Sequence, residues 1–186
     1  MNDNAAKERP ARIMVPVCLV AALALALRLL HVYFTQRANP LAPALQLDAA
    51  TYDRWARALA AGGDPGPTTL MQSPVYPWFV SLLYRVFGPS LAAVRVAQAL
   101  LGTATCVLVA LATRRLFSSL AAAVVAGLVA ALYAPFIFYE GMILPATLIV
   151  FLNALFLSIA CAGGKPGARR LLAAGVVFGA AVAATP

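Results

Sequence analysis

The sequence is poor in charge. Only 11% of its 186 residues are charged, and its six acidic residues face 14 Lys and Arg. In soluble domains about a quarter of the residues are charged. This chain, in contrast, is 63% hydrophobic and has a mean hydropathy of +0.87. A soluble core of this length cannot hide so much apolar surface. The composition therefore excludes an ordinary soluble domain and predicts an integral, all-α membrane protein.

Cysteine is scarce as well. Cys18, Cys106 and Cys161 lie inside or at the edge of apolar segments, and thiols scattered in this way form neither a disulfide framework nor a metal site. The net charge of +8 does not indicate a nucleic-acid partner, because the basic residues form short clusters between apolar runs. Such clusters are typical of membrane topology signals.

Long apolar runs, in contrast, are abundant. We predict one membrane domain over residues 1–186, a polytopic helix bundle with a long first outer loop that carries short interfacial helices. Its expected parts are a cytoplasmic tail (1–12), four spans (13–34, 91–113, 118–138 and 142–162), the outer loop (35–90) and the start of a fifth span (171–186). The first run is longer than a signal-peptide core, which favours a retained span over a cleaved signal. The last run is shorter than the roughly 20 residues needed to cross a bilayer, so we expect a truncated chain.

Three basic clusters set the predicted orientation. They are Lys7, Arg9 and Arg12, then Arg114 and Arg115, then Lys165, Arg169 and Arg170. An even number of spans separates successive clusters, so all three share one face. The positive-inside rule makes that face cytoplasmic. The long loop and the turn at Glu140 are then expected on the non-cytoplasmic face of a bacterial-type inner or plasma membrane.

Two short helices are expected within the long loop. Residues 48–61 form the first, with Asp48 as a possible N-cap and Gly62-Gly63 as its end. Residues 76–87 form the second, which is aromatic-rich, too short to span, and suited to the plane of the membrane interface.

Two acids, Asp48 and Glu140, are expected at the same membrane face. A carboxylate there can take a proton from an acceptor hydroxyl, or hold a divalent cation against a phosphate. The alternatives are a helix cap for Asp48 and an acid in a wet turn for Glu140. Asp48, Tyr52 and Trp55 fall on one helical face. Aromatic rings beside an acid suit sugar stacking, although the same stripe is equally able to pack on lipid.

Three further polar residues lie within apolar runs. Arg28 and His31 are one helical turn apart near the end of the first run, where they either snorkel to the outer interface or meet an anionic ligand group. Asn153 is expected to make an interhelical hydrogen bond.

The order of these segments resembles the GT-C membrane glycosyltransferases of the dolichyl-phosphate-mannose protein mannosyltransferase type, which include bacterial aminoarabinose transferases. The segments that carry the resemblance are DAATYDRWARALAAG, QSPVYPWFVSLLYRVFGPSLAAVRVAQALLG, TRRLF and YAPFIFYEGMILPATLIVFLNAL. The resemblance covers residues 13–186, the N-terminal portion of such an enzyme. In two places the chain departs from the pattern: Ala49 follows Asp48 where many relatives have a second acid, and Gln72 stands where relatives have a lysine.

The resemblance implies inverting transfer of a sugar from a polyprenyl-phosphate donor to a protein or lipid acceptor. Asp48 is the expected catalytic base. The residues expected to contact the donor are Glu140, Tyr52, Trp55, Gln72, Tyr76 and Tyr139. The metal requirement stays open, with a divalent cation as the candidate cofactor. Two alternatives also stay open: a non-enzymatic membrane protein, such as a transporter or an assembly subunit, and an inactive fragment. A transporter needs polar residues or broken helices at mid-membrane, and here only Asn153 and Pro145 come close.

Overall fold

The computed structural model describes residues 3–38, 44–66, 73–164 and 166–185, with side chains from Met14 onward. These ranges contain helices and no strand. The helices are α1 (Asp3–Ala38), α2 (Leu47–Ala60), α3 (Val75–Phe87), α4 (Leu91–Phe117), α5 (Leu120–Leu132), α6 (Ala134–Gly141), α7 (Ala146–Ala160) and α8 (Ala168–Ala183).

Two helices are long and apolar enough to cross a membrane: the Met14–Ala38 part of α1, and α4. A third candidate span is the pair formed by α5 and α6, which is bent by 47°. Large apolar side chains are exposed along the bundle, among them Leu19, Leu100 and Val125, as expected where lipid replaces water as the solvent. The protein is therefore an integral, all-α membrane protein. Helices α7 and α8 coincide with the predicted fourth and fifth spans but have only 15 and 16 residues.

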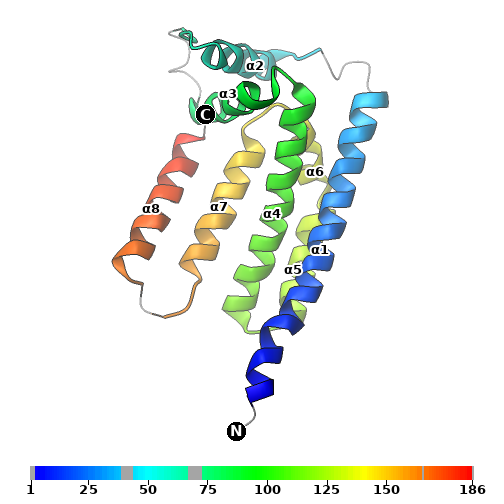
Figure 1. Ribbon diagram of the computed structural model, residues 1–186, viewed down its shortest axis with the longest axis vertical. Helices are drawn as coiled ribbons and strands as arrows, with labels where there is room; N and C mark the ends of the chain where they lie inside the picture. Colours follow the sequence, from blue (N-terminus) through cyan, green and yellow to red (C-terminus); the bar gives the residue numbers. More distant parts are fainter. Residues whose placement is uncertain (1–2, 39–43, 67–72, 165, 186) are drawn as a thin grey trace.

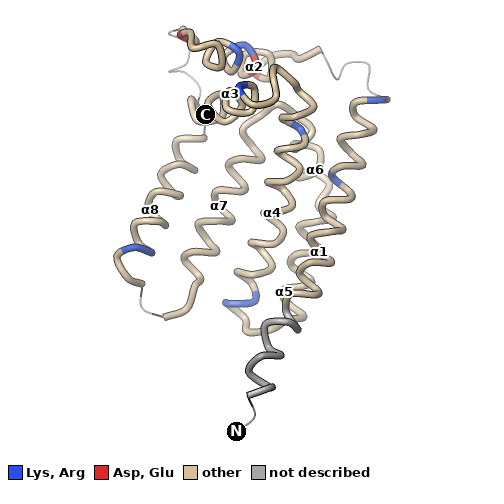
Figure 2. The backbone as a smooth tube through the Cα atoms, viewed as in Figure 1, with Lys and Arg blue, Asp and Glu red and all other residues tan. Residues whose placement is uncertain are grey.

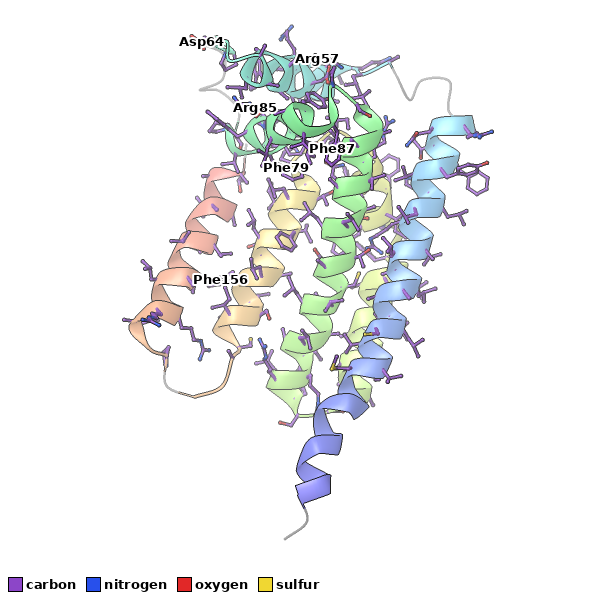
Figure 3. The ribbon with its side chains drawn as sticks, viewed as in Figure 1. Arg57, Asp64, Phe79, Arg85, Phe87 and Phe156 are labelled. Atoms are coloured by element: carbon purple, nitrogen blue, oxygen red, sulfur yellow. The ribbon has the colours of Figure 1, made fainter. Side chains whose placement is uncertain are left out.

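Helix α4 lies at the centre of the bundle and contacts α1, α5, α6 and α7. Helices α2 and α3 pack on each other and lie across one end of the bundle (Figure 1). The α4–α5 and α7–α8 connections and the N-terminus lie at the other end (Figure 1). Helix α8 is at the edge, where Phe178 packs on Phe156 of α7 with ring centroids 5.2 Å apart (Figure 3).

Small residues allow the spans to approach closely. Ala24 of α1 and Ala131 of α5 are fully buried. A Cβ atom added at Gly127 of α5 would lie 3.0 Å from Val20 Cγ1 of α1 and 3.1 Å from Ala110 Cβ of α4. Helices in lipid associate through this kind of packing, because no hydrophobic effect drives them together.

The break between α5 and α6 has a local cause in the sequence. Tyr133 leaves the helical conformation, with φ −69° and ψ 100°, two residues before Pro135. Proline has no N–H, and its ring clashes with the carbonyl four residues earlier, which here belongs to Ala131. That carbonyl instead accepts a hydrogen bond from Arg28 Nη1 of α1, at 3.4 Å. The bend therefore redirects α6 and leaves a buried acceptor for an arginine.

Basic residues gather at both ends of the bundle (Figure 2). At the end with the short connections, two of them bind the C-terminus of α7. Arg115 donates to Ser158 O at 2.6 Å, and Arg170 donates to Ile159 O at 2.9 Å and to Ala160 O at 2.6 Å. Cations and donors at a helix C-terminus satisfy its free carbonyls and oppose its dipole. The residues predicted as topology signals therefore also cap a helix.

Candidate active site

A buried ion pair joins the first span to α6. Arg28 Nε of α1 lies 2.7 Å from Glu140 Oε2 of α6, and the two side chains are 0% and 6% exposed. The contact is a close, buried ion pair. Arg28 Nη1 also donates to Ala24 O at 3.2 Å. Arg28 therefore neither snorkels to the interface nor stands free for a ligand, and Glu140 is not an acid in a wet turn.

Two glycines leave space for the side chains of this ion pair and of His31. A Cβ atom at Gly102 of α4 would overlap the Glu140 carboxylate. A Cβ atom at Gly141 would lie 2.8 Å from His31 Nε2. Arg28 and His31, one turn apart on α1, thus both face the end of α6. The sequence predicted that the two side chains share a face, but not that a protein carboxylate is the anion which Arg28 meets.

Helix α4 holds the backbone around Glu140. Gln98 Nε2 donates to Glu140 O and to Met142 O, at 2.7 Å each. Arg95 Nε donates to Gly141 O at 3.0 Å. These three carbonyls close the C-terminus of α6, where a helix leaves acceptors without intrahelical partners. Glu140 is therefore fixed through its side chain by α1 and through its backbone by α4.

A pocket of about 250 Å³ opens beside Glu140, between α4, α6 and α7. Its lining combines three aromatic rings with a few polar groups and small residues: Gly102, Thr105, Tyr133, Pro135, Phe136, Tyr139, Glu140, Ala146, Thr147 and Val150. Thr147 is 5% exposed, and its hydroxyl has no hydrogen-bond partner among the residues that the structure describes. The pocket thus offers one carboxylate and one free hydroxyl in an aromatic surrounding.

Three aromatic residues of α2 and α3, Tyr52, Trp55 and Tyr76, pack on one another and do not face outward. Tyr52 and Trp55 are each 2% exposed, and Tyr76 is 0% exposed. The Tyr52 ring meets the Trp55 ring and the Tyr76 ring edge to face, at 6.1 Å and 5.2 Å between centroids. The predicted shared face of Tyr52 and Trp55 therefore packs on α3, and neither a sugar nor lipid contacts it directly in this arrangement.

Polar contacts on the outside of the same helix pair hold α2 and α3 together. Tyr84 of α3 donates to Asp53 Oδ1 of α2, and Asp53 Oδ2 accepts from Arg57 Nε at 2.8 Å. Burial and then the bond to Asp53 raise the pKa of Tyr84. Arg85 Nη2 donates to Leu59 O at 2.7 Å, and Figure 3 shows Arg57 and Arg85 on this helix pair. Asp48 and its helix are therefore attached to a rigid two-helix unit.

Asp48 itself is exposed in the first turn of α2. The prediction that it caps this helix is wrong, because the helix begins one residue earlier, at Leu47, and Gln46 is the N-cap residue. Its carboxylate still lies where a helix dipole favours negative charge. It also contributes to raising the pKa of Tyr52, after the larger effect of burial.

The structure brings some of the predicted site residues together and leaves others apart. Tyr139 and Glu140 line one pocket, and Tyr52, Trp55 and Tyr76 form one aromatic cluster. Asp48 is not among the residues that line the pocket, and Gln72 lies outside the described residues.

Comparison with known proteins decides the family. Residues 71–184, more than half of the chain, match the family model of dolichyl-phosphate-mannose-protein mannosyltransferases. The chain belongs to this family. It is a membrane glycosyltransferase of the GT-C type. No curated protein and no solved structure matches the chain.

Only part of the glycosyltransferase's predicted site lies within that match. Tyr76, Tyr139 and Glu140 fall inside residues 71–184, whereas Asp48 and Tyr52 precede them. The role of Asp48 therefore depends on the residues around it and not on the family match.

The described residues of the glycosyltransferase do not fit a divalent cation at the pocket. Among them, no three His, Cys, Asp or Glu side chains come together as a metal-binding group. The one carboxylate that lines the pocket is already neutralised by Arg28.

The sequence did not identify Gln98 or Thr147 as residues of this site, and it did not pair Arg28 with Glu140, which it did predict as a site residue. Arg28 and Glu140 both lie at the ends of apolar runs, and this was a signal for pairing, because charged side chains within a membrane usually form ion pairs. Asn153 was predicted to bond a neighbouring helix, but its amide donates to Ile149 O of its own helix at 2.8 Å.

Proposed function

We propose that this glycosyltransferase moves a sugar from a polyprenyl-phosphate donor to a protein or lipid acceptor at the non-cytoplasmic face of the membrane. The observation that carries the proposal is the pocket beside Glu140. Its acid, its free Thr147 hydroxyl and its aromatic rings suit a substrate with a polar head and an apolar chain. Such pockets are mostly apolar, with few oriented polar groups.

The distribution of basic residues supports the proposed face. Arg115 and Arg170 lie at the end of the bundle that carries the α4–α5 and α7–α8 connections. Helices α2 and α3 and the turn at Glu140 lie at the opposite end (Figures 1 and 2). By the positive-inside rule, short connections rich in Lys and Arg are cytoplasmic. The pocket and the outer helix pair would then share the non-cytoplasmic side.

Asp48 is the proposed catalytic base. In an inverting transfer, the acceptor hydroxyl oxygen attacks the anomeric carbon while the bond from that carbon to the phosphate oxygen breaks. The electron pair leaves with the polyprenyl phosphate, and the acceptor proton passes to the carboxylate. Asp48 suits this step because it is exposed and ionisable at the start of α2. Leu47, directly before it, has φ 51°, and backbone strain of this kind, of about 1–3 kcal/mol, often accompanies functional sites.

Glu140 and Tyr139 are the proposed donor contacts, because both line the pocket. Gln72 is proposed to act at the same donor, on the resemblance alone. Tyr52, Trp55 and Tyr76, expected from the sequence to contact the donor, are buried, and we propose that they shape the outer helix pair and do not stack on the sugar.

The test is transfer by the purified full-length protein in proteoliposomes. A panel of polyprenyl-phosphate sugars, each with labelled sugar, is supplied with acceptor lipid or membrane protein extract. We expect protein-dependent release of polyprenyl phosphate and label in the acceptor for one donor. Thr147→Val should weaken the apparent affinity for that donor, with Thr103→Val as the matched control, since the Thr103 hydroxyl bonds its own helix at Ala99 O. No transfer from any donor would refute the proposal.

A further inference from the structure

We propose that Tyr76 and Gln98 are positioning residues of the transferase. Their hydrogen bond holds the outer helix pair, which carries Asp48, in register with the turn that carries Glu140. The catalytic consequence rests on the proposed function. The structural consequence stands without it.

Gln98 lies where three parts of the chain meet. It is 0% exposed on α4. Its Oε1 accepts from the Tyr76 hydroxyl of α3 at 2.6 Å, while Nε2 donates to Glu140 O and Met142 O. Both N–H groups of the amide are therefore used, and a single side chain links an outer helix to the end of α6.

The groups around Gln98 determine which atom donates and which accepts in each hydrogen bond of this bridge. Two backbone carbonyls are acceptors only, so they require the NH₂ group of Gln98 on their side. Oε1 then faces Tyr76, whose hydroxyl must donate. Burial raises the pKa of Tyr76 well above its ordinary value, so the hydroxyl keeps its proton. A fully satisfied buried network of this kind specifies one arrangement of the helices.

Aromatic contacts extend the bridge to the proposed base. The Tyr76 ring packs edge to face on Tyr52, with 5.2 Å between centroids. Tyr52 is one helical turn after Asp48 on α2. At the other end, Glu140 is held by Arg28 at 2.7 Å. The bridge therefore connects a helix outside the bundle to an acid whose side chain and backbone are both fixed.

The kinetic test compares two buried hydroxyls of α3 in the full-length protein. Tyr76→Phe removes the hydroxyl that reaches α4. Ser81→Ala is the matched control, since Ser81 is also buried and its hydroxyl bonds Trp78 O within α3. Small errors in the placement of reacting groups cost up to about 100-fold in rate. We therefore expect Tyr76→Phe to lower kcat by about 10- to 100-fold with little change in the KM for donor, and Ser81→Ala to keep the parent kcat.

A distance measurement tests the bridge independently of activity. Spin labels at Arg54 of α2 and Met142 after α6, both exposed, are introduced in a cysteine-free background. We expect Tyr76→Phe to broaden the distance distribution and Ser81→Ala to leave it as in the parent. We also expect Tyr76→Phe to add nothing to the kcat loss of Gln98→Leu, because residues that act through one bond are not additive.

Equal distance distributions in Tyr76→Phe and Ser81→Ala would overturn the proposal. So would equal kcat values in the two variants of an active parent. A parent without transfer activity would refute the proposed function alone, because the label distances still report whether the bridge holds α2 in place.

Discussion

The buried pair of Arg28 and Glu140 allows a stability prediction with a defined magnitude. Removing one partner of a buried ion pair costs about 3–5 kcal/mol, because the remaining charge stays buried without compensation. The two side chains are 0% and 6% exposed, so both charges are shielded from water in this structure. We therefore expect Arg28→Met and Glu140→Met each to destabilise the protein by about 3–5 kcal/mol. Replacing both charges together should restore most of the loss, since well-packed apolar side chains of similar volume often replace such a pair at no cost.

The assay is thermal unfolding of the full-length protein in one detergent. For chains of 150–250 residues, 1 kcal/mol shifts Tm by about 2–4 °C, so each single variant should lose about 6–20 °C. The control is the pair of Arg57 and Asp53 on α2, in which the Arg57 side chain is 46% exposed. Arg57→Met should cost at most about 0.5 kcal/mol. The reasoning fails if Glu140→Met costs no more than Arg57→Met, or if the double variant loses the sum of the two single losses.

Three further predictions follow from the same geometry. Gly102→Ala should cost about 1–3 kcal/mol of stability, because its Cβ overlaps a buried carboxylate. Gly175→Ala on α8, where nothing lies within 4 Å of the new atom, should be neutral or stabilising by up to about 1 kcal/mol; equal Tm values for the two would contradict this. Asp48→Asn should lower sugar transfer by about 10²–10⁴-fold at an unchanged Tm, whereas a fully active variant would remove this residue from the mechanism. Single cysteines at Asp64 and Gly163 should react with an impermeant reagent from opposite sides of the membrane; reaction of both from outside would refute the predicted topology.

The helices were predictable from the sequence because lipid imposes long apolar runs and allows few breaks. The first apolar run, the central run after Ser90 and the two short helices of the outer loop correspond to helices of the structure. Ser90 and Ser119 are the N-cap residues of α4 and α5, and their side chains accept hydrogen bonds from Ala93 N and Ala122 N. The family resemblance was also confirmed. The number of spans and the site residues stay predictions.

Contacts between distant residues were not predictable in the same way. The N-cap of α2 was predicted at Asp48 and lies two residues earlier, at Gln46, because the end of a helix depends on local backbone geometry that the sequence does not specify to the residue. The contact between Arg28 and Glu140 depends on the bend at Pro135, which turns α6 toward α1. Gln98 carried no sequence signal for its role, because one amide in an apolar helix has many possible acceptors.

The pair of Arg28 and Glu140 also has a consequence for biosynthesis. The two residues are 112 positions apart in the chain. At about 5–20 residues per second, the ribosome reaches Glu140 roughly 6–22 s after Arg28. During that interval α1 is in the membrane and Arg28 lacks its Glu140 partner, at a cost of at most about 2.5–3.5 kcal/mol, the value for an arginine at mid-bilayer. The growing chain therefore holds its first span in a metastable state until α6 emerges, and a translation pause before Glu140 would prolong the exposure of α1 to membrane quality control.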